Sequence, residues 1–219
     1  MAHLTFPQII SLVKDIITGI AVPITVWIAY QGLSTWRKQL QGNADLELSR
    51  LVLRSVYKFR EAIIQVRSPG MFQSEINEAL EAAELELEES DRDYGWKSSL
   101  AVYHRRMNYI LSAKTDLDTA LLEAEAMWDK EIRLVIKPLY DHYIKLYVAI
   151  RRYHYDLQHS KRPNKTSSEE AYESMSKCET IMLDMGDEDN PDEYGMKLTK
   201  IIEEIEKYIR PKMKREHDK

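Results

Sequence analysis

The chain has 219 residues, 31% of them charged and 44% hydrophobic, and a formal net charge of −5 at pH 7. This acidic balance argues against a general nucleic-acid-binding protein, which normally carries a surplus of basic residues, and the lone Cys178 excludes an internal disulfide, as expected for a cytosolic body. Glycine and proline are few, while Leu, Glu, Ala, Lys and Ile are abundant, so we expect an all-α protein.

The first predicted element is a transmembrane helix in residues 16–36. This stretch contains no charged side chain, and roughly 20 predominantly apolar helical residues cross a bilayer core. Trp36 closes the apolar run and Arg37 and Lys38 follow it, which is the order expected at a membrane interface. We therefore predict a membrane anchor in residues 1–41 that contacts the lipid bilayer, with Trp36, Arg37 and Lys38 at the interface.

The flanking charges predict the orientation of this anchor. Residues 1–13 contain no Lys or Arg. The basic residues that follow the apolar run most closely are Arg37, Lys38, Arg50 and Arg54. Because positively charged loops stay on the cytoplasmic side, we expect a single-pass protein of the bacterial inner membrane, with its N-terminus outside and residues 42–219 forming a cytoplasmic helical domain.

Two other interpretations of residues 16–36 stay open. A cleavable signal peptide would use Lys14 as its basic flank, although residues 29–32 are a poor cleavage site. A buried helix of a soluble protein would have to cover its whole circumference within a domain of modest size. Thr18, Pro23 and Thr25 make the run less uniformly apolar.

Beyond the anchor, apolar residues recur every three or four positions, which predicts an antiparallel helical bundle with two long helices. We expect a break at residues 41–43 and a stop at Ser68-Pro69-Gly70. The predicted helices cover residues 44–67, 72–87, 96–128, 129–159, 168–182 and 193–214. The two long helices should form a hairpin, with the helix of residues 44–67 in its groove.

Several blocks of sequence carry a resemblance to known proteins. They are GLSTWRKQL at residues 32–40, ELSR at 47–50, VYKFREAI at 56–63, VRSP at 66–69 and IEKYIRP at 205–211. In these blocks the chain resembles a group of uncharacterised bacterial proteins with one N-terminal transmembrane helix and a helical cytoplasmic body. The resemblance implies a bacterial membrane protein and transfers no catalytic residue.

Candidate catalytic residues are sparse. Arg152 and His159 fit the loose Arg-x(4–6)-His spacing of helical ribonucleases of the HEPN type, in which an imidazole moves a proton and a guanidinium steadies phosphate charge. The alternative is an exposed polar helix end. No phosphate-binding glycine loop, His/Cys metal spacing or nucleophile elbow is present, and the acids near Pro191 do not complete a calcium loop, so we expect no cofactor and no metal.

Arginines and tyrosines that cluster on the two long predicted helices raise another possibility. They are Tyr103, Arg105, Arg106, Tyr109, Arg151, Arg152, Tyr153 and Tyr155. Together they could form a basic aromatic surface for nucleic acid or phospholipid, or the amphipathic rim of an ordinary core.

The leading prediction is a membrane-anchored helical interaction or scaffold protein that binds a protein partner or forms a homo-oligomer and has no catalytic activity of its own. One alternative is a membrane-tethered HEPN-like ribonuclease effector in stress or phage response, acting through Arg152 and His159. A second alternative is an oligomeric pore-forming effector, in which Thr18, Pro23 and Thr25 would lie at the helix interface or channel.

Overall fold

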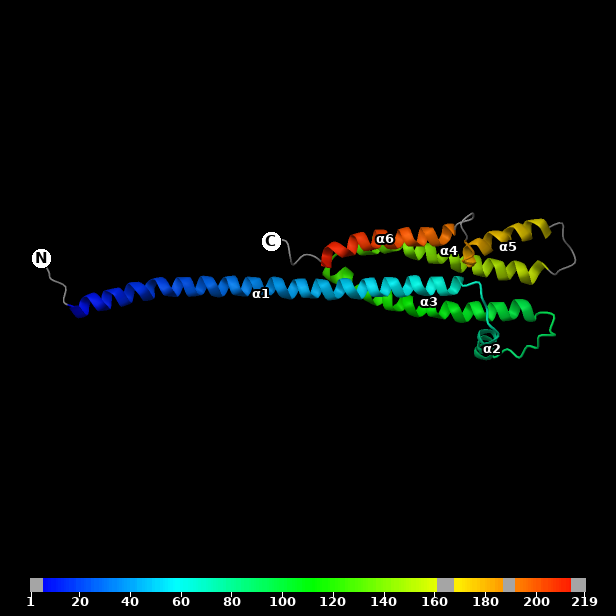
Figure 1. Cartoon of the computed structure of the whole chain (residues 1–219), viewed down its shortest axis with the longest axis horizontal. Coiled ribbons are helices and arrows are strands. Elements are labelled where there is room, and N and C mark those ends of the chain that lie inside the picture. Colours follow the sequence, from blue (N-terminus) through cyan, green and yellow to red (C-terminus); the bar gives the residue numbers. More distant parts are fainter. Residues whose placement is uncertain (1–5, 161–167, 187–191, 214–219) are drawn as a thin grey trace.

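The structure is a computed structural model that describes residues 6–160, 168–186 and 192–213. All regular structure in these residues is helical, which confirms the all-α class and the helical bundle. The helices are α1 (Phe6–Arg67), α2 (Gln73–Ala82), α3 (Tyr94–Met127), α4 (Glu131–Ser160), α5 (Ser168–Met182) and α6 (Glu193–Met213) (Figure 1).

Helix α1 runs without interruption for 62 residues, about 93 Å at a rise of roughly 1.5 Å per residue. The predicted break at residues 41–43 is therefore wrong. A glycine inside a helix costs only about 1 kcal/mol relative to Ala and an asparagine less, and the segment lacks the proline that would remove a helical hydrogen bond. The predicted stop is confirmed, because Pro69 disfavours helical geometry at Ser68.

The bundle has four columns that alternate in direction (Figure 1). Three columns are the C-terminal part of α1, α3 and α4, and the fourth is formed by α5 and α6 in series. Helix α1 packs against α3 and α6, and α4 packs against α3, α5 and α6. The predicted α3–α4 hairpin is thus confirmed, whereas the helix of residues 44–67 packs against α3 and α6 and does not lie in the groove between α3 and α4.

Residues spaced three or four apart along each column fill one continuous core, as their periodicity predicts. Phe59 of α1 contacts two rings of α4 edge-on, with centroid distances of 5.8 Å to Tyr140 and 5.6 Å to Tyr143. The largest fully buried apolar side chains are Phe59, Ile63, Ile110, Leu117, Leu121, Ile132, Ile136, Leu139, Leu146, Met182 and Ile205.

Helix α2 ends at Ala82, earlier than the predicted end near residue 87. Glu84 adopts a left-handed conformation with φ of 53°, and the N–H groups of Glu84 and Leu85 bond back to the carbonyls of Glu81 and Leu80. This pattern closes a helix C-terminus. The following glutamates repel one another at helical spacing, which explains why the helix does not continue.

The buried Arg106 of α3 fixes the connection between α1 and α2. Its guanidinium forms two bonds of 2.7 Å to the Glu75 carboxylate and donates to the carbonyls of Ser68 at 2.7 Å and Gly70 at 2.6 Å. The hydrogen bond from Arg106 holds the pKa of Glu75 below its ordinary value. A single side chain therefore ties a loop and α2 to the bundle.

Within the described residues, no helix combines the length and the apolar character needed to cross a membrane. The side chains of Ile16, Thr18 and Val22, which belong to the predicted span, lie outside the described part. The transmembrane part of the predicted fold stays a prediction.

Candidate functional site

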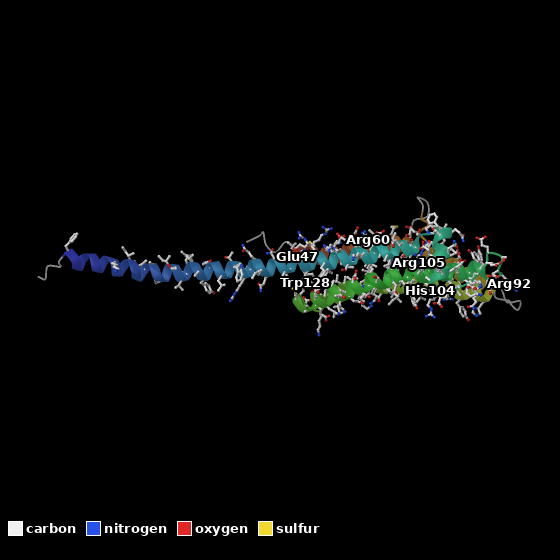
Figure 2. All side chains as sticks on the ribbon, turned by 90° about the horizontal axis from the view of Figure 1, so that it is seen from below. Glu47, Arg60, Arg92, His104, Arg105 and Trp128 are labelled. Atoms are coloured by element: carbon white, nitrogen blue, oxygen red, sulfur yellow. The ribbon has the colours of Figure 1, made fainter. Side chains whose placement is uncertain are left out.

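The N-terminal part of α1, residues 6–44, projects beyond the bundle, and we call it the stem. Figures 1 and 2 both show it with no other element alongside. Its described side chains are exposed except for the half-buried Ser34 and Gly42. The large apolar side chains exposed on the stem are Phe6, Ile17, Ile20, Ile24, Val26, Trp27, Ile28, Tyr30, Leu33, Trp36 and Leu40.

These apolar side chains surround the stem. Val26, Trp27 and Ile28 are consecutive and are 63%, 62% and 59% exposed. Because successive helical residues point about 100° apart, these three alone face three different sides. A helix that is apolar all round is normally buried, whereas the described apolar side chains of the stem are exposed.

The described serine and threonine hydroxyls of the stem form hydrogen bonds within their own helix. Thr25 donates to the carbonyl of Ala21 at 2.8 Å, and Ser34 and Thr35 donate to the carbonyl of Gln31 at 2.9 and 3.0 Å. Bonds of this kind satisfy Ser and Thr within their own helix. Their hydroxyls are therefore compatible with an apolar surrounding.

The three predicted interface residues Trp36, Arg37 and Lys38 are all exposed near the C-terminal end of the stem. The bundle begins nine residues after Trp36, at Asp45, which accepts a hydrogen bond of 2.9 Å from Nε1 of Trp128. Nine helical residues span about 13 Å. This end of the bundle, formed by Asp45, Trp128 and the end of α6, is called the base.

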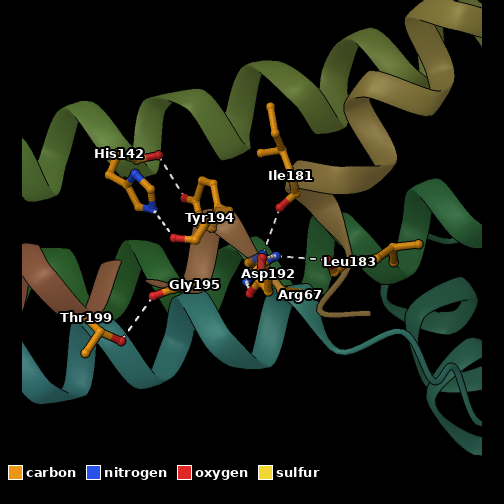
Figure 3. A network of polar contacts seen from close by, with 8 residues as sticks. All are labelled: Arg67, His142, Ile181, Leu183, Asp192, Tyr194, Gly195 and Thr199. Carbon is orange, nitrogen blue, oxygen red and sulfur yellow. Dashed lines mark hydrogen bonds and ion pairs between the residues drawn. The ribbon is translucent and has the colours of Figure 1, made fainter. Parts of the chain in front are cut away.

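At the opposite end of the bundle column of α1, the buried Arg67 joins three segments (Figure 3). It donates to the carbonyls of Ile181 and Leu183 at 2.8 Å each and forms bonds of 2.6 and 2.7 Å to the two oxygens of Asp192. Its Cζ atom lies 4.5 Å from the ring centre of Tyr194. The guanidinium thus holds the end of α5 against the start of α6.

Asp192 precedes α6 and caps it. Burial acts to raise the pKa of Asp192, but the hydrogen bonds from Arg67 and from the backbone N–H of Gly195 outweigh it and keep the pKa below its ordinary value. A Cβ atom at Gly195 would lie only 2.2 Å from Oδ2 of Asp192. Glycine at this position therefore allows the carboxylate to approach the helix.

His142 of α4 and Tyr194 of α6 hold each other in a reciprocal contact (Figure 3). The rings stack with centroids 3.7 Å apart, the Tyr194 hydroxyl donates to the carbonyl of His142 at 2.8 Å, and Nε2 of His142 lies 3.1 Å from the carbonyl of Tyr194. Since a carbonyl can only accept, Nε2 carries the proton. Burial lowers the pKa of His142 to about 4, so the imidazole is neutral at physiological pH.

A cavity of about 600 Å³ adjoins this contact, lined by residues of α4, α5, α6 and the segment between α5 and α6. Its charged lining is mixed. Lys145 and Lys197 contribute positive charge, and Glu179, Asp192 and Glu193 contribute negative charge. No group of three or more His, Cys, Asp or Glu side chains in the described residues is placed to hold a metal ion, and the acids at residues 187–189 lie outside that part.

Arg152 and His159 lie two turns apart on α4 and have separate partners. Arg152 donates to the hydroxyl of Ser174 at 2.9 Å and lines a cavity of about 550 Å³ between α4 and α5. Nδ1 of His159 lies 2.7 Å from the carbonyl of Tyr155, and the two rings stack. No hydrogen bond or ion pair of the described residues joins Arg152 to His159.

The arginines and tyrosines of the long helices do not form a single surface. Arg106 and Tyr103 are buried, and Arg105 forms an ion pair with Glu78. The interpretation as an amphipathic rim therefore accounts better for these positions than a basic aromatic surface.

A second histidine contact, which no sequence motif marks, joins Ser99 of α3 to the buried His154 of α4. Nδ1 of His154 lies 2.8 Å from the carbonyl of Ile150, and Nε2 lies 3.2 Å from the Ser99 hydroxyl. The ring also meets Tyr103 and Tyr153 edge-on. The pair is a helix-to-helix contact within the core.

Comparison with protein-family models, with curated proteins and with solved structures finds no match to this chain.

Proposed function

We propose that this chain is a single-pass membrane protein whose helical bundle binds other proteins or further copies of itself and performs no chemistry of its own. The observation that supports the anchor is the stem, whose large apolar side chains are exposed on every side. A partner helix would cover one face of it, whereas lipid covers the full circumference.

The dimensions of the stem support the same proposal. Residues 16–36 span about 31 Å as a helix, close to the roughly 30 Å thickness of a bilayer core. Trp36, Arg37 and Lys38 then occupy the cytoplasmic interface, where amphipathic rings and positive charges are favoured. The bundle follows on the cytoplasmic side.

The continuity of α1 gives the anchor a mechanical role in this proposal. The same helix that enters the membrane supplies the core residues Val52, Val56, Phe59 and Ile63 of the bundle. With no flexible linker, the base stands about 13 Å from the interface. The bundle is therefore presented to partners at a fixed height.

The polar side chains of the bundle support binding in preference to catalysis. Arg67 and Arg106 hold helix ends and a loop in place. His142 and His154 are buried contacts between helices. Arg152 and His159 contact different neighbours, so their geometry gives the ribonuclease alternative no additional support.

Topology reporters test the orientation of the chain, and an arginine substitution in the stem tests the anchor. A C-terminal green fluorescent protein fusion should fluoresce and a C-terminal alkaline phosphatase fusion should be inactive, because both reporters would lie in the cytoplasm. Trp27→Arg should release the protein from the membrane, since arginine near the centre of a span costs about 2.5 to 3.5 kcal/mol. Leu122→Arg, at an exposed apolar position of α3, is the matched control, and an equal effect of both changes would refute the proposal.

A further inference from the structure

A shallow groove of about 580 Å³ runs along α1 beside the end of α6, and we call it the basic groove. Its apolar floor consists of Leu53, Tyr57 and Met213. Its charged lining is four basic residues, Arg50, Arg54, Lys58 and Arg60, against one acidic residue, Glu61. The positive surplus is confined to this lining, because the carboxylates of Glu47, Asp116 and Glu206 contact its edges.

Three of the basic residues form a ladder. Arg50, Arg54 and Lys58 recur at every fourth position, which places them along one side of α1 over about 12 Å. Arg50 lies 3.6 Å from Glu47 and Lys58 lies 3.2 Å from Asp116, both in exposed pairs. Exposed pairs of this kind are weak, so an incoming carboxylate can replace either partner.

Two of the arginines have unmet capacity for acceptors. Arg54 has no carboxylate within 4 Å in the described part of the chain. The guanidinium of Arg60 (Figure 2) lies 5.3 Å from the ring centre of Tyr57 and forms no hydrogen bond or ion pair with the described residues. A carboxylate is the strongest acceptor for a guanidinium.

The position of the groove excludes two occupants. Arg50 follows Trp36 by 14 residues, about 21 Å of helix, whereas the headgroup layer of a bilayer is only about 5 to 8 Å thick. Lipid headgroups therefore do not reach it. The acidic segment of residues 81–93 lies at the end of the bundle away from the base (Figure 1). In a second copy anchored in the same membrane, this segment would lie farther from the membrane than the basic groove, so it would not reach the groove.

We propose that the basic groove docks an acidic polypeptide segment of a partner protein. Carboxylates one helical turn apart meet Arg50, Arg54 and Lys58, and an apolar side chain of the same segment covers the floor of the groove. The apolar floor and Glu61 favour such a segment over a nucleic acid, which offers phosphates at every step and no aliphatic side chain. This inference rests on the proposed interaction role and specifies its partner.

Fluorescence anisotropy of the detergent-solubilised full chain tests the inference. The probe is a fluorescein-labelled peptide that repeats Glu-Ala-Ala-Leu, so that its glutamates recur at every fourth position and a leucine three positions after each glutamate lies on the same side of the helix. The test variant is Arg50→Glu with Arg54→Glu. The control is Lys130→Glu with Lys200→Glu, which makes the same change in net charge at exposed positions outside the groove.

The groove variant should weaken binding by at least about tenfold and the control by less than about twofold, and binding should weaken with added salt. Arg54→Gln, a milder change at an exposed position, should weaken binding to an intermediate extent. Absence of binding, an equal loss in both double variants, or tighter groove-dependent binding of an RNA oligonucleotide would each overturn the inference. Because the assay requires no bilayer, these outcomes leave the anchor proposal standing.

Discussion

Replacing Arg67 by methionine should destabilise the whole bundle. The change preserves an aliphatic side chain but removes the guanidinium that holds α1, α5 and α6 together. It leaves the carbonyls of Ile181 and Leu183 without this donor and Asp192 without its charge partner.

The expected loss in the free energy of unfolding follows from the burial of the pair. Arg67 is 2% exposed, and the Asp192 side chain is 15% exposed. Breaking a buried ion pair from one side costs about 3 to 5 kcal/mol. Asp192 retains some access to water and its bond from Gly195, so we expect the lower end, about 3 kcal/mol.

Urea denaturation of the solubilised full chain, followed by circular dichroism, measures this loss. Arg67→Met with Asp192→Asn should be more stable than the sum of the two single changes predicts, because it leaves no unpaired carboxylate and keeps a good helix cap. Arg210→Met is the control, since Arg210 pairs with Glu206 at the surface and exposed pairs contribute about 0 to 1 kcal/mol. A loss at Arg67 no larger than that at Arg210 would show that the pair does not hold the bundle.

Three further predictions concern the same end of the bundle and its pH dependence. Gly195→Ala should destabilise the protein, because its Cβ would lie 2.2 Å from Oδ2 of Asp192, whereas Gly95→Ala, with no neighbour within 4 Å, should stabilise it by up to about 1 kcal/mol in the same assay. Burial lowers the pKa of His142 to about 4, so the unfolded chain takes up a proton first and stability should fall between about pH 6.5 and pH 4. His142→Gln should flatten that decline in denaturation measured across pH, and an unchanged slope would contradict it. The pKa of Glu75 is lower in the folded chain than its unfolded value of about 4.5, so the ionised carboxylate stabilises the protein above that pH. This stability is lost as the pH falls through the folded pKa. Glu75→Gln should therefore reduce the acid sensitivity in that lower pH range.

Much of the fold could be predicted from the spacing of apolar residues. The stripes of α3 and α4 are long and regular, and Pro69 marks a true helix end, so these elements lie where the sequence places them. The predicted break at Gly42 was wrong, because the weak local preference of a glycine does not interrupt a helix whose following residues are packed in the bundle. The predicted end of α2 lies too far along the chain, because charge repulsion among the glutamates after Ala82 outweighs the short apolar stripe.

The contacts at the end of α1 could not be predicted in the same way. Arg67 and Asp192 are 125 positions apart, and nothing local to either residue distinguishes it from a surface charge. Their pairing depends on the series arrangement of α5 and α6, which periodicity alone does not specify. Arg152 and His159 show the opposite case. Their spacing in the sequence matches a motif, yet in the structure each side chain contacts a different neighbour.

The central claim is that lipid covers the stem, and fractionation of cells that express the full chain tests it most directly. After ultracentrifugation without detergent, the intact chain should sediment with the membranes, resist extraction by alkaline carbonate and dissolve in detergent. Ile24→Arg with Trp27→Arg should abolish this behaviour, whereas Leu122→Arg with Leu134→Arg, at exposed apolar positions of the bundle, should not. Recovery of the unaltered chain in the detergent-free supernatant would contradict the account.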